Sequence, residues 1–339
     1  MSQRIVCFGE LLLRLGAPGH ERLLQSPALQ VHVGGAEANV AVALARYGHE
    51  AAVIGRVADN ALGAAAVAEL RRHGVDTRAV RPAPGRMGLY FLETGAGHRP
   101  SSVLYDRADS AFARAGADAY DWPALLEGAA WLHLSGVTPA LGPVTAQAAI
   151  AAAQAARRAG VRVSFDGNFR SKLWQAWSGD AAAILRELMA QAELIFADHR
   201  DFAVVLGFET DAASAEQRFA DAARAAFAAF PQLQRVASTV RVQHSVDRQS
   251  LSALSLHRDG AAAQTPVCEL SAIVDRIGSG DAFAAGVLHG LISGMDDAHS
   301  LQFGWGAACL KHAVPGDFGW SDAEEVAAFV AQDGYHVRR

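Results

Sequence analysis

The chain has 339 residues, of which 51% are hydrophobic, so it can bury a large core and is not an intrinsically disordered protein. A formal net charge of −5 gives no basic field for nucleic acid, and no apolar run is long enough for a transmembrane helix. The three cysteines form neither an even set nor a CxxC pair, and the N-terminal apolar run is too short for a signal peptide. We therefore expect a cytoplasmic protein that binds small molecules, with no nucleic acid and no membrane among its partners.

Short strand-like runs alternate with alanine-rich helical runs along most of the chain. The strand-like runs are residues 4–8, 51–55, 129–136, 161–166 and 193–198, and the helical runs are 39–48, 61–74, 143–160 and 181–191. Three more helical runs close the chain, and Ser321 followed by Glu324 is typical of a capping box at the start of the last one. The alternation predicts an α/β fold in one domain over residues 1–339, a three-layer αβα sandwich with a mostly parallel central sheet.

Two segments, at about 11–34 and 86–107, break this alternation. Each contains strand-like runs that are separated by turns and not by helices. We expect them to form a small antiparallel sheet that projects from the domain. Such a sheet often acts as a lid, which excludes water from a reaction centre. A projecting sheet is also a natural surface for a two-fold partner, so a homodimer or a larger homo-oligomer through the lid is expected.

The stretch GSGDAF comes just before a helical run near the end of the chain. Gly278 and Gly280 let an anion approach the backbone amides, and the start of the helix adds unpaired N–H groups. Asp281 would then be placed to accept a proton from a hydroxyl that attacks phosphorus. The alternative is a glycine turn whose aspartate only caps the helix. The chain has no GK[ST] triplet and this spacing is not G-x-G-x-x-G, which argues against a P-loop enzyme and a simple dinucleotide dehydrogenase.

A second glycine-led stretch, VGGAEANVAVALARYG, spans residues 33–48. Gly34 and Gly35 end a strand-like run, and Asn39 lies at the start of an amphipathic helix. Exposed amides and one amide side chain could therefore meet sugar hydroxyls. Taken alone, the stretch fits an ordinary strand-to-helix turn better.

Together, GGAEANVAVALARYG near the start and DRIGSGDAFAAG near the end resemble the two signature regions of the ribokinase family, the PfkB-type carbohydrate kinases. The resemblance extends over nearly the whole chain. It implies a ribokinase-like fold, ATP-dependent phosphorylation of a sugar hydroxyl, and Mg²⁺ carried on the nucleotide. By motif position, Asp281 takes the role of catalytic base, and the amides of Gly278, Ser279 and Gly280 take that of the anion hole.

Other segments, among them LYDRADSA (104–111) and FDGNFRSKLW (165–174), resemble the 2-keto-3-deoxygluconate kinases of this family. That substrate is a sugar acid, whose carboxylate prefers a guanidinium partner. Arg107 and Arg170 are the candidates, although each could form a surface ion pair instead. The substrate site implied in this way consists of Gly34, Gly35, Asn39, Tyr90, Tyr105, Arg107, Arg170 and Asp281. A fructokinase, another PfkB-type sugar kinase and a 2-keto-3-deoxygalactonate kinase are the alternatives.

The nucleotide side departs from the family pattern. Asp198 and Asp201 stand where many members have Asn-x-x-Glu, so Asp198 is expected at the nucleotide and Asp201 at magnesium through water. Residues 237–250 contain no glycine where members have a glycine-rich turn, and Thr239 and Arg241 are expected to meet phosphate oxygens there. Gly278 and Gly280 would also contact the nucleotide.

Lys311 and His312 lie where family members line the adenine pocket, and the alternative for both is an exposed place on a late helix. Some relatives bind a monovalent cation near the position of Asp275, and the sequence leaves open whether this chain does. Two other classes of protein stay as alternatives. One is a catalytically silent sugar- or nucleotide-binding protein, which would have no need of Asp281. The other is a nicotinamide-dependent oxidoreductase, which rests on the α/β pattern alone.

Overall fold

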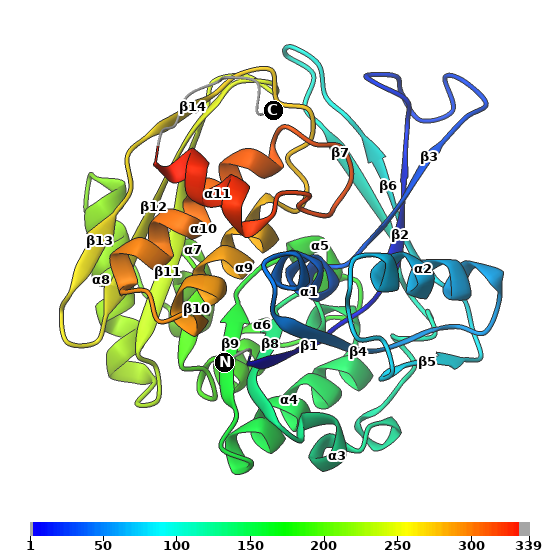
Figure 1. The fold of residues 1–339 in the computed structure, drawn as a ribbon, viewed down its shortest axis with the longest axis horizontal. Helices are drawn as coiled ribbons and strands as arrows, with labels where there is room; N and C mark the ends of the chain where they lie inside the picture. Colours follow the sequence, from blue (N-terminus) through cyan, green and yellow to red (C-terminus); the bar gives the residue numbers. More distant parts are fainter. Residues whose placement is uncertain (1–2, 332–339) are drawn as a thin grey trace.

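The structure is a computed structural model that describes residues 3–331, and a ten-stranded sheet forms its centre (Figure 1). The strand order is β13-β12-β11-β10-β9-β8-β1-β4-β5, with β14 also paired to β12. The strands are β1 (Arg4–Phe8), β4 (Glu50–Ala58), β5 (Val80–Ala83), β8 (Ala129–Ser135), β9 (Arg162–Asp166), β10 (Leu194–Phe196), β11 (Arg235–Gln243), β12 (Gln249–His257), β13 (Ala262–Gln264) and β14 (Cys268–Leu270). The run from β11 to β5 is parallel, and β12 to β14 add an antiparallel edge.

Side chains of the central strands alternate between two separate cores. On β1, Ile5 and Cys7 belong to one buried cluster, while Val6 and Phe8 belong to the other. Successive residues of a strand point to opposite faces, so a strand that is apolar throughout must be covered on both sides. The sheet is therefore the middle of three layers, as the sequence predicts.

Helices cover both faces. One layer contains α1 (Ala36–Arg46), α2 (Ala61–Arg72), α9 (Ser279–Ile292), α10 (Asp297–Lys311) and α11 (Ala323–Val330). The other contains α3 (Trp122–Leu126), α4 (Pro143–Arg158), α5 (Ser171–Gln175), α6 (Ala181–Met189), α7 (His199–Leu206) and α8 (Ala215–Ala229). This arrangement confirms the predicted α/β sandwich. Among residues 3–331, no helix combines the length and the apolar character needed to span a membrane.

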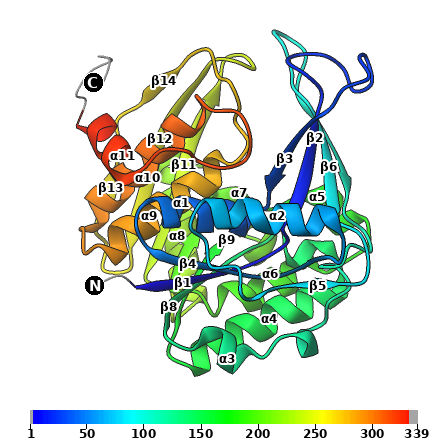
Figure 2. The same cartoon turned by 45° about the vertical axis from the view of Figure 1, so that its right-hand side comes forward.

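A second sheet of four strands, the lid, stands away from the main domain (Figure 2). Its strands are β2 (Leu12–Gly16), β3 (Gln30–Gly34), β6 (Gly88–Glu93) and β7 (Ser102–Asp106), in the order β3-β2-β6-β7. The prediction of an antiparallel lid is wrong for its central pair, because β2 and β6 run parallel. The two outer pairs are antiparallel hairpins, and the chain passes through α1, β4, α2 and β5 between them, so the hairpins meet side by side.

One local prediction is corrected. The N-cap of α11 is Asp322, whose carboxylate accepts the amide of Glu325 at 2.9 Å, so the predicted capping box at Ser321 and Glu324 is one residue early. Aspartate caps a helix as well as serine does, and the sequence pattern fits both registers. Residues 237–250 are mostly the paired strands β11 and β12, which form a long hairpin in place of a glycine-rich turn.

Candidate active site

Two cavities meet at the carboxyl ends of the parallel strands, where α/β sheets commonly bind ligands. The lid cavity, of about 460 Å³, lies between the lid and the starts of α1 and α9. The hairpin cavity, of about 790 Å³, lies beside β10, β11 and the start of α7. The residues that line both cavities are Asp166, Asn168, Arg170, Arg241, Arg276 and Gly280. Their shared wall makes one continuous site with two compartments.

The turn before α9 opens onto this junction. Gly278 is the N-cap residue, with a φ of 82°, and a Cβ there would lie 2.0 Å from the carbonyl oxygen of Asp317, so only glycine fits. A Cβ on Gly280 would meet nothing within 4 Å, which leaves open space above its amide. The amide of Ser279 donates to the carbonyl of Arg276 at 3.3 Å, whereas within residues 3–331 the amides of Gly278 and Gly280 have no acceptor. Two free amides at a helix N-terminus suit an anion.

Asp281 lies in the first turn of α9 and lines the lid cavity. The side-chain amide of Asn39 donates to its carboxylate at 2.6 Å. Burial raises the pKa of Asp281 to about 7, and the carboxylates of Glu37 and Asp317 act in the same direction against the Asn39 hydrogen bond and the charge of Arg170. A carboxylate with a pKa near neutrality is well matched to accepting a proton.

Asp166, which sequence analysis missed, belongs to both cavities. Burial raises its pKa well above the usual range, and repulsion from Asp281 and Asp201 adds to this, while Arg170 opposes it. Carboxylates that repel one another at a junction of cavities indicate a site for cations. The sequence does contain a signal for this residue, because Asp166 is the last residue of a buried parallel strand. The carboxyl ends of such strands meet at the edge of the sheet where ligands bind.

The substrate residues proposed from sequence gather around the lid cavity, with one exception. Gly35, Asn39, Tyr90, Tyr105, Arg107 and Arg170 all line it. Gly34 does not, but a Cβ there would lie 2.2 Å from Oδ2 of Asp317, so it makes room for that carboxylate. Tyr90 contributes a hydroxyl that donates to the same oxygen at 2.7 Å.

The two candidate arginines differ in their partners. Arg107 is buried and its Nε lies 2.6 Å from Oε2 of Glu10, so its charge is already paired. Arg170 is exposed and, among residues 3–331, has no carboxylate within 4 Å. The pairing follows from tertiary contact between the loop after β1 and the loop after β7, which no local pattern reveals. Arg170 is thus the arginine free to bind an anion.

Arg170, Arg241 and Arg276 together make a positively charged wall at the junction. Arg241 donates to the hydroxyl of Ser279 at 3.0 Å. Burial and repulsion from Arg276 lower the pKa of Arg241. Asp166 lies in the same wall, but within residues 3–331 none of the three guanidinium groups forms an ion pair, and unpaired guanidinium groups near one another favour a polyanionic ligand. Arg276 was not among the residues proposed from sequence, although it lies within the signature-like stretch DRIGSGDAFAAG.

Asp198 and Asp201 line the hairpin cavity at the start of α7, as does Thr239 on β11. The two aspartates form a capping box, in which Asp198 accepts the amide of Arg200 at 2.7 Å and Asp201 accepts the amide of Asp198 at 3.0 Å. Asp198 also pairs with the Arg200 side chain, whereas burial raises the pKa of Asp201 to about 6, with Asp198 adding to the shift. In the described part of the chain, no three His, Cys, Asp or Glu side chains form a ready metal cage.

Lys311 and His312 line neither cavity. Both are buried, so the alternative of an exposed position is wrong. The Nδ1 atom of His312 lies 2.7 Å from the carbonyl oxygen of Ala308. Helix α10 is covered by α9, α11 and β12, which is why its last turn is enclosed. Their contact with an adenine ring stays a prediction.

The chain is similar to carbohydrate kinases in sequence and in fold. The family model described as pfkB family carbohydrate kinase matches residues 2–318. A 2-dehydro-3-deoxygalactonokinase of Haloferax volcanii is 35% identical over 96% of both chains. The crystal structure of a 2-dehydro-3-deoxygluconokinase from Thermotoga maritima has a TM-score of 0.92 and 35% identity, covering 97% of this chain and 99% of its own. A fructokinase from Xylella fastidiosa with bound ATP, at 21% identity and a TM-score of 0.80, covers 98% of this chain and 99% of its own and shares the fold. The chain belongs to the pfkB family of carbohydrate kinases and is a phosphotransferase that acts on an alcohol group.

Proposed function

We propose that this kinase phosphorylates a 2-keto-3-deoxy sugar acid, with 2-keto-3-deoxygluconate as the first candidate, at its C6 hydroxyl with ATP as donor. The observation that carries the proposal is the position of Asp281. It lines the lid cavity at the N-terminus of α9, beside the wall shared with the hairpin cavity. A sugar in the first cavity and a triphosphate in the second would present an attacking hydroxyl and a γ-phosphoryl group to each other at this wall.

In the proposed reaction, the Asp281 carboxylate takes the proton of the hydroxyl while its oxygen forms a bond to phosphorus and the bond to ADP breaks. The free amides of Gly278 and Gly280 stabilise charge on the phosphoryl oxygens. Arg276 and Arg241 add positive charge from the shared wall. The lid excludes water, which would otherwise compete with the sugar hydroxyl.

Magnesium bound to the nucleotide would supply further neutralisation of phosphate charge. The donor set fits such an ion, because Asp166 and Asp201 line the hairpin cavity and neither has an ion-pair partner within residues 3–331. Burial raises the pKa of both carboxyl groups; repulsion from Asp281 and Asp201 adds to the shift of Asp166, and repulsion from Asp198 adds to that of Asp201. Mg²⁺ keeps most of its water and needs only one or two carboxylates besides the phosphates. These two side chains would hold it through water.

The acid is proposed for two reasons. Arg170 lines the lid cavity and forms no ion pair within residues 3–331, and the relatives from Haloferax volcanii and Thermotoga maritima are named for sugar acids. Those two names differ in the acid, galactonate or gluconate. The lid contributes Tyr90 and Tyr105 to the cavity wall, which suits the carbon chain of either.

Magnesium-dependent ADP release across a panel of substrates tests the proposal. The panel holds 2-keto-3-deoxygluconate, 2-keto-3-deoxygalactonate, fructose and ribose, with several nucleotide donors. We expect kcat/KM for an acid to exceed that for fructose by a factor of roughly 10² or more, since a paired carboxylate is a strong anchor. Turnover of fructose or ribose with none of either acid would refute the proposal.

We also propose that two copies associate through the lid. Val31 and Leu104 are 58% and 59% exposed on the lid strands β3 and β7. Exposed aliphatic side chains on a projecting sheet favour a partner surface. Sedimentation of the protein alone, compared with a Leu104→Lys variant, tests this; a monomeric wild type would contradict it.

A further inference from the structure

Lys311 is an ammonium group enclosed by the protein. It ends α10, its residue is 1% exposed, and its Nζ donates to the carbonyl oxygens of Val314 at 3.1 Å and Asp275 at 3.4 Å. Lysines normally keep their charged end in water. The only other lysine of the chain is Lys172, and lysine and arginine together number 30, so arginine supplies nearly all the positive charge. Lys311 is therefore one of only two positions in the chain where an ammonium group stands in place of a guanidinium group.

The two carbonyls belong to the two segments that build one end of the lid cavity. Asp275 begins the turn that leads to Asp281, and Val314 precedes Asp317, which lines the cavity. The segments are in close contact, because the amide of Gly316 donates to Oδ2 of Asp275 at 3.1 Å. The Cε atom of Lys311 would lie only 3.4 Å from a Cβ at Gly278. The ammonium thus lies directly beneath the proposed anion hole.

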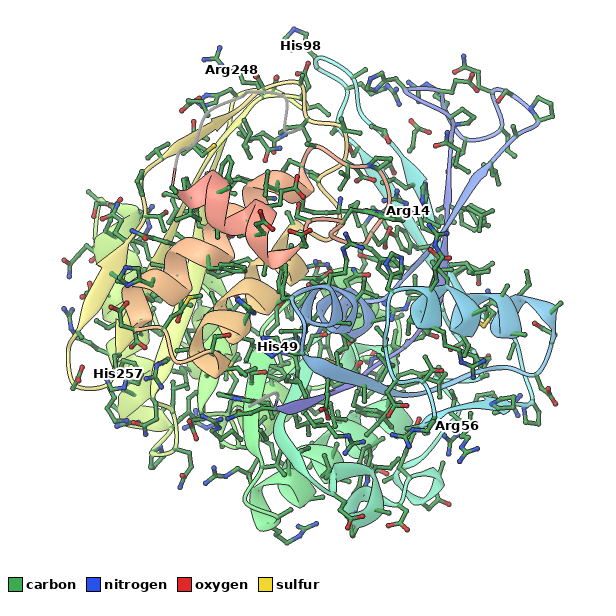
Figure 3. The ribbon with its side chains drawn as sticks, in the orientation of Figure 1. Arg14, His49, Arg56, His98, Arg248 and His257 are labelled. Atoms are coloured by element: carbon green, nitrogen blue, oxygen red, sulfur yellow. The ribbon has the colours of Figure 1, made fainter. Side chains whose placement is uncertain are left out.

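Two cationic side chains, Arg14 and Lys311, lie close to the carboxylates of Asp275 and Asp317. Arg14, which comes from lid strand β2 (Figure 3), bonds Oδ2 of Asp275 at 2.6 Å and approaches Oδ1 of Asp317 at 3.1 Å. Arg14 therefore takes the carboxylates, and Lys311 is left with carbonyl oxygens. Rings of backbone carbonyls are the ligands by which proteins hold potassium, and a compact ammonium resembles that ion more closely than a planar guanidinium does.

We infer that Lys311 is a positioning residue whose ammonium serves as a tethered monovalent cation: it fixes the carbonyls of Asp275 and Val314 and so holds the turn 275–281 ready for phosphoryl transfer without a free cation. The inference rests on the proposed function of that turn. It explains why the side chain is buried yet touches neither cavity.

The protonation state agrees with this role. Burial lowers the pKa of Lys311 to about 8, while Asp275, Asp317 and Asp281 act to raise it and Arg14 acts to lower it. The ammonium is thus charged at neutral pH and loses its charge above pH 8. A tethered cation predicts activity that falls on the alkaline side and recovers when a small cation is added.

The test compares wild type with Lys311→Met, which removes the charge and keeps the length, in sodium, potassium, ammonium or choline chloride. Wild-type kcat is expected to agree within about twofold in all four salts. The variant is expected to lose roughly 10²-fold in sodium, as for a misplaced catalytic group, and to regain at least about tenfold in potassium or ammonium. Lys172→Met, at the exposed lysine, is the matched control and should behave as wild type.

A variant that no cation restores, or a wild type that requires potassium, would overturn the inference. If Lys311→Met does not fold, Lys311→Gln takes its place, because its amide can still donate to the carbonyls; wild-type activity in that variant would show that charge is not needed. Thermal denaturation in the four salts is a second readout, in which only potassium and ammonium should stabilise the variant. That readout stays informative if wild type phosphorylates no sugar acid, an outcome that would count against the proposed function alone.

Discussion

The side-chain amide of Asn39 donates a hydrogen bond to the carboxylate of Asp281 across 2.6 Å, although 242 positions separate them in the chain. The contact joins α1 to α9, the two helices that follow the glycine-led stretches. It stabilises the charged form of Asp281 in a place where burial favours the neutral form. The two stretches that resemble the family's signature regions therefore meet at Asp281, the proposed catalytic base.

Replacement of the proposed base, Asp281→Asn, should lower turnover strongly without unfolding the protein. We expect kcat to fall by roughly 10²–10⁴, the usual contribution of a general base, while the Kd of the sugar acid in calorimetry changes little. The folded state raises the pKa of Asp281, so it binds the proton more tightly than the unfolded chain, and stability falls as pH rises to about 7. At pH 8 the variant should be more stable by about 1–2 kcal/mol in urea unfolding. Retained activity would refute the assignment.

The pH dependence of kcat/KM should report the same carboxyl group. Its pKa of about 7 means that the active carboxylate is depleted at lower pH, so kcat/KM should fall tenfold per unit below pH 7. Asn39→Ala removes a donor to the charged form and should move this acidic limb to higher pH. An unchanged limb in that variant would assign it to another group.

Arg276→Met tests the positive wall between the cavities. Arg276 lines both of them, so its loss should lower kcat by roughly 10²–10³ and raise the KM for ATP, with little change in the KM for the sugar acid. Arg78→Ala is the control, because Arg78 is an exposed arginine that pairs with Asp76 away from both cavities. Steady-state kinetics with each substrate varied in turn would separate these effects. Equal behaviour of the two variants would contradict the role.

Arg170→Ala tests the proposed carboxylate partner. Arg170 lines the lid cavity and has no ion-pair partner in the part of the chain that the structure describes, so its loss should raise the KM for the sugar acid by roughly 10–10²-fold. Arg170→Lys should restore only part of this, because an ammonium cannot make the two parallel hydrogen bonds of a guanidinium. The parent sugar without its carboxylate serves as the control substrate and should be affected much less. An equal loss for both substrates would refute a carboxylate contact.

Gly278→Ala tests the close approach behind the anion hole, and Gly74→Ala is its matched control. The two glycines have nearly the same φ, 82° and 83°, but only at Gly278 would a Cβ meet another atom, the carbonyl oxygen of Asp317 at 2.0 Å. Gly74→Ala should cost about 1–2 kcal/mol in urea unfolding, for backbone strain alone. Gly278→Ala should cost more and should also lose activity. Equal stability and full activity in both variants would refute the contact.

Much of the fold was predictable because it depends on local patterns. Residues 5–8 are apolar throughout, which a parallel strand covered on both faces requires, and residues 161–165 have an apolar side chain at every second position. The strands β1 and β9 form in these predicted runs. The position of the lid in the chain was predicted, but its central strand pairing was not, since the parallel contact of β2 with β6 joins residues 76 positions apart. Local sequence carries no signal of that register.

The sequence alone determined the chemistry of the site. The stretches GSGDAF and GGAEAN contain an aspartate at the start of a helix and glycines that leave the backbone amides accessible. These residues were enough to indicate a phosphotransferase of the pfkB family. Only the tertiary structure decided how the charges are shared: Arg107 is paired with Glu10, Arg276 faces both cavities, and Lys311 is enclosed beneath the turn. The physical reason is that the pKa of a group and the energy of its charge interactions depend on its burial and on its nearest charged partner. Both are set by segments that meet only when the chain folds.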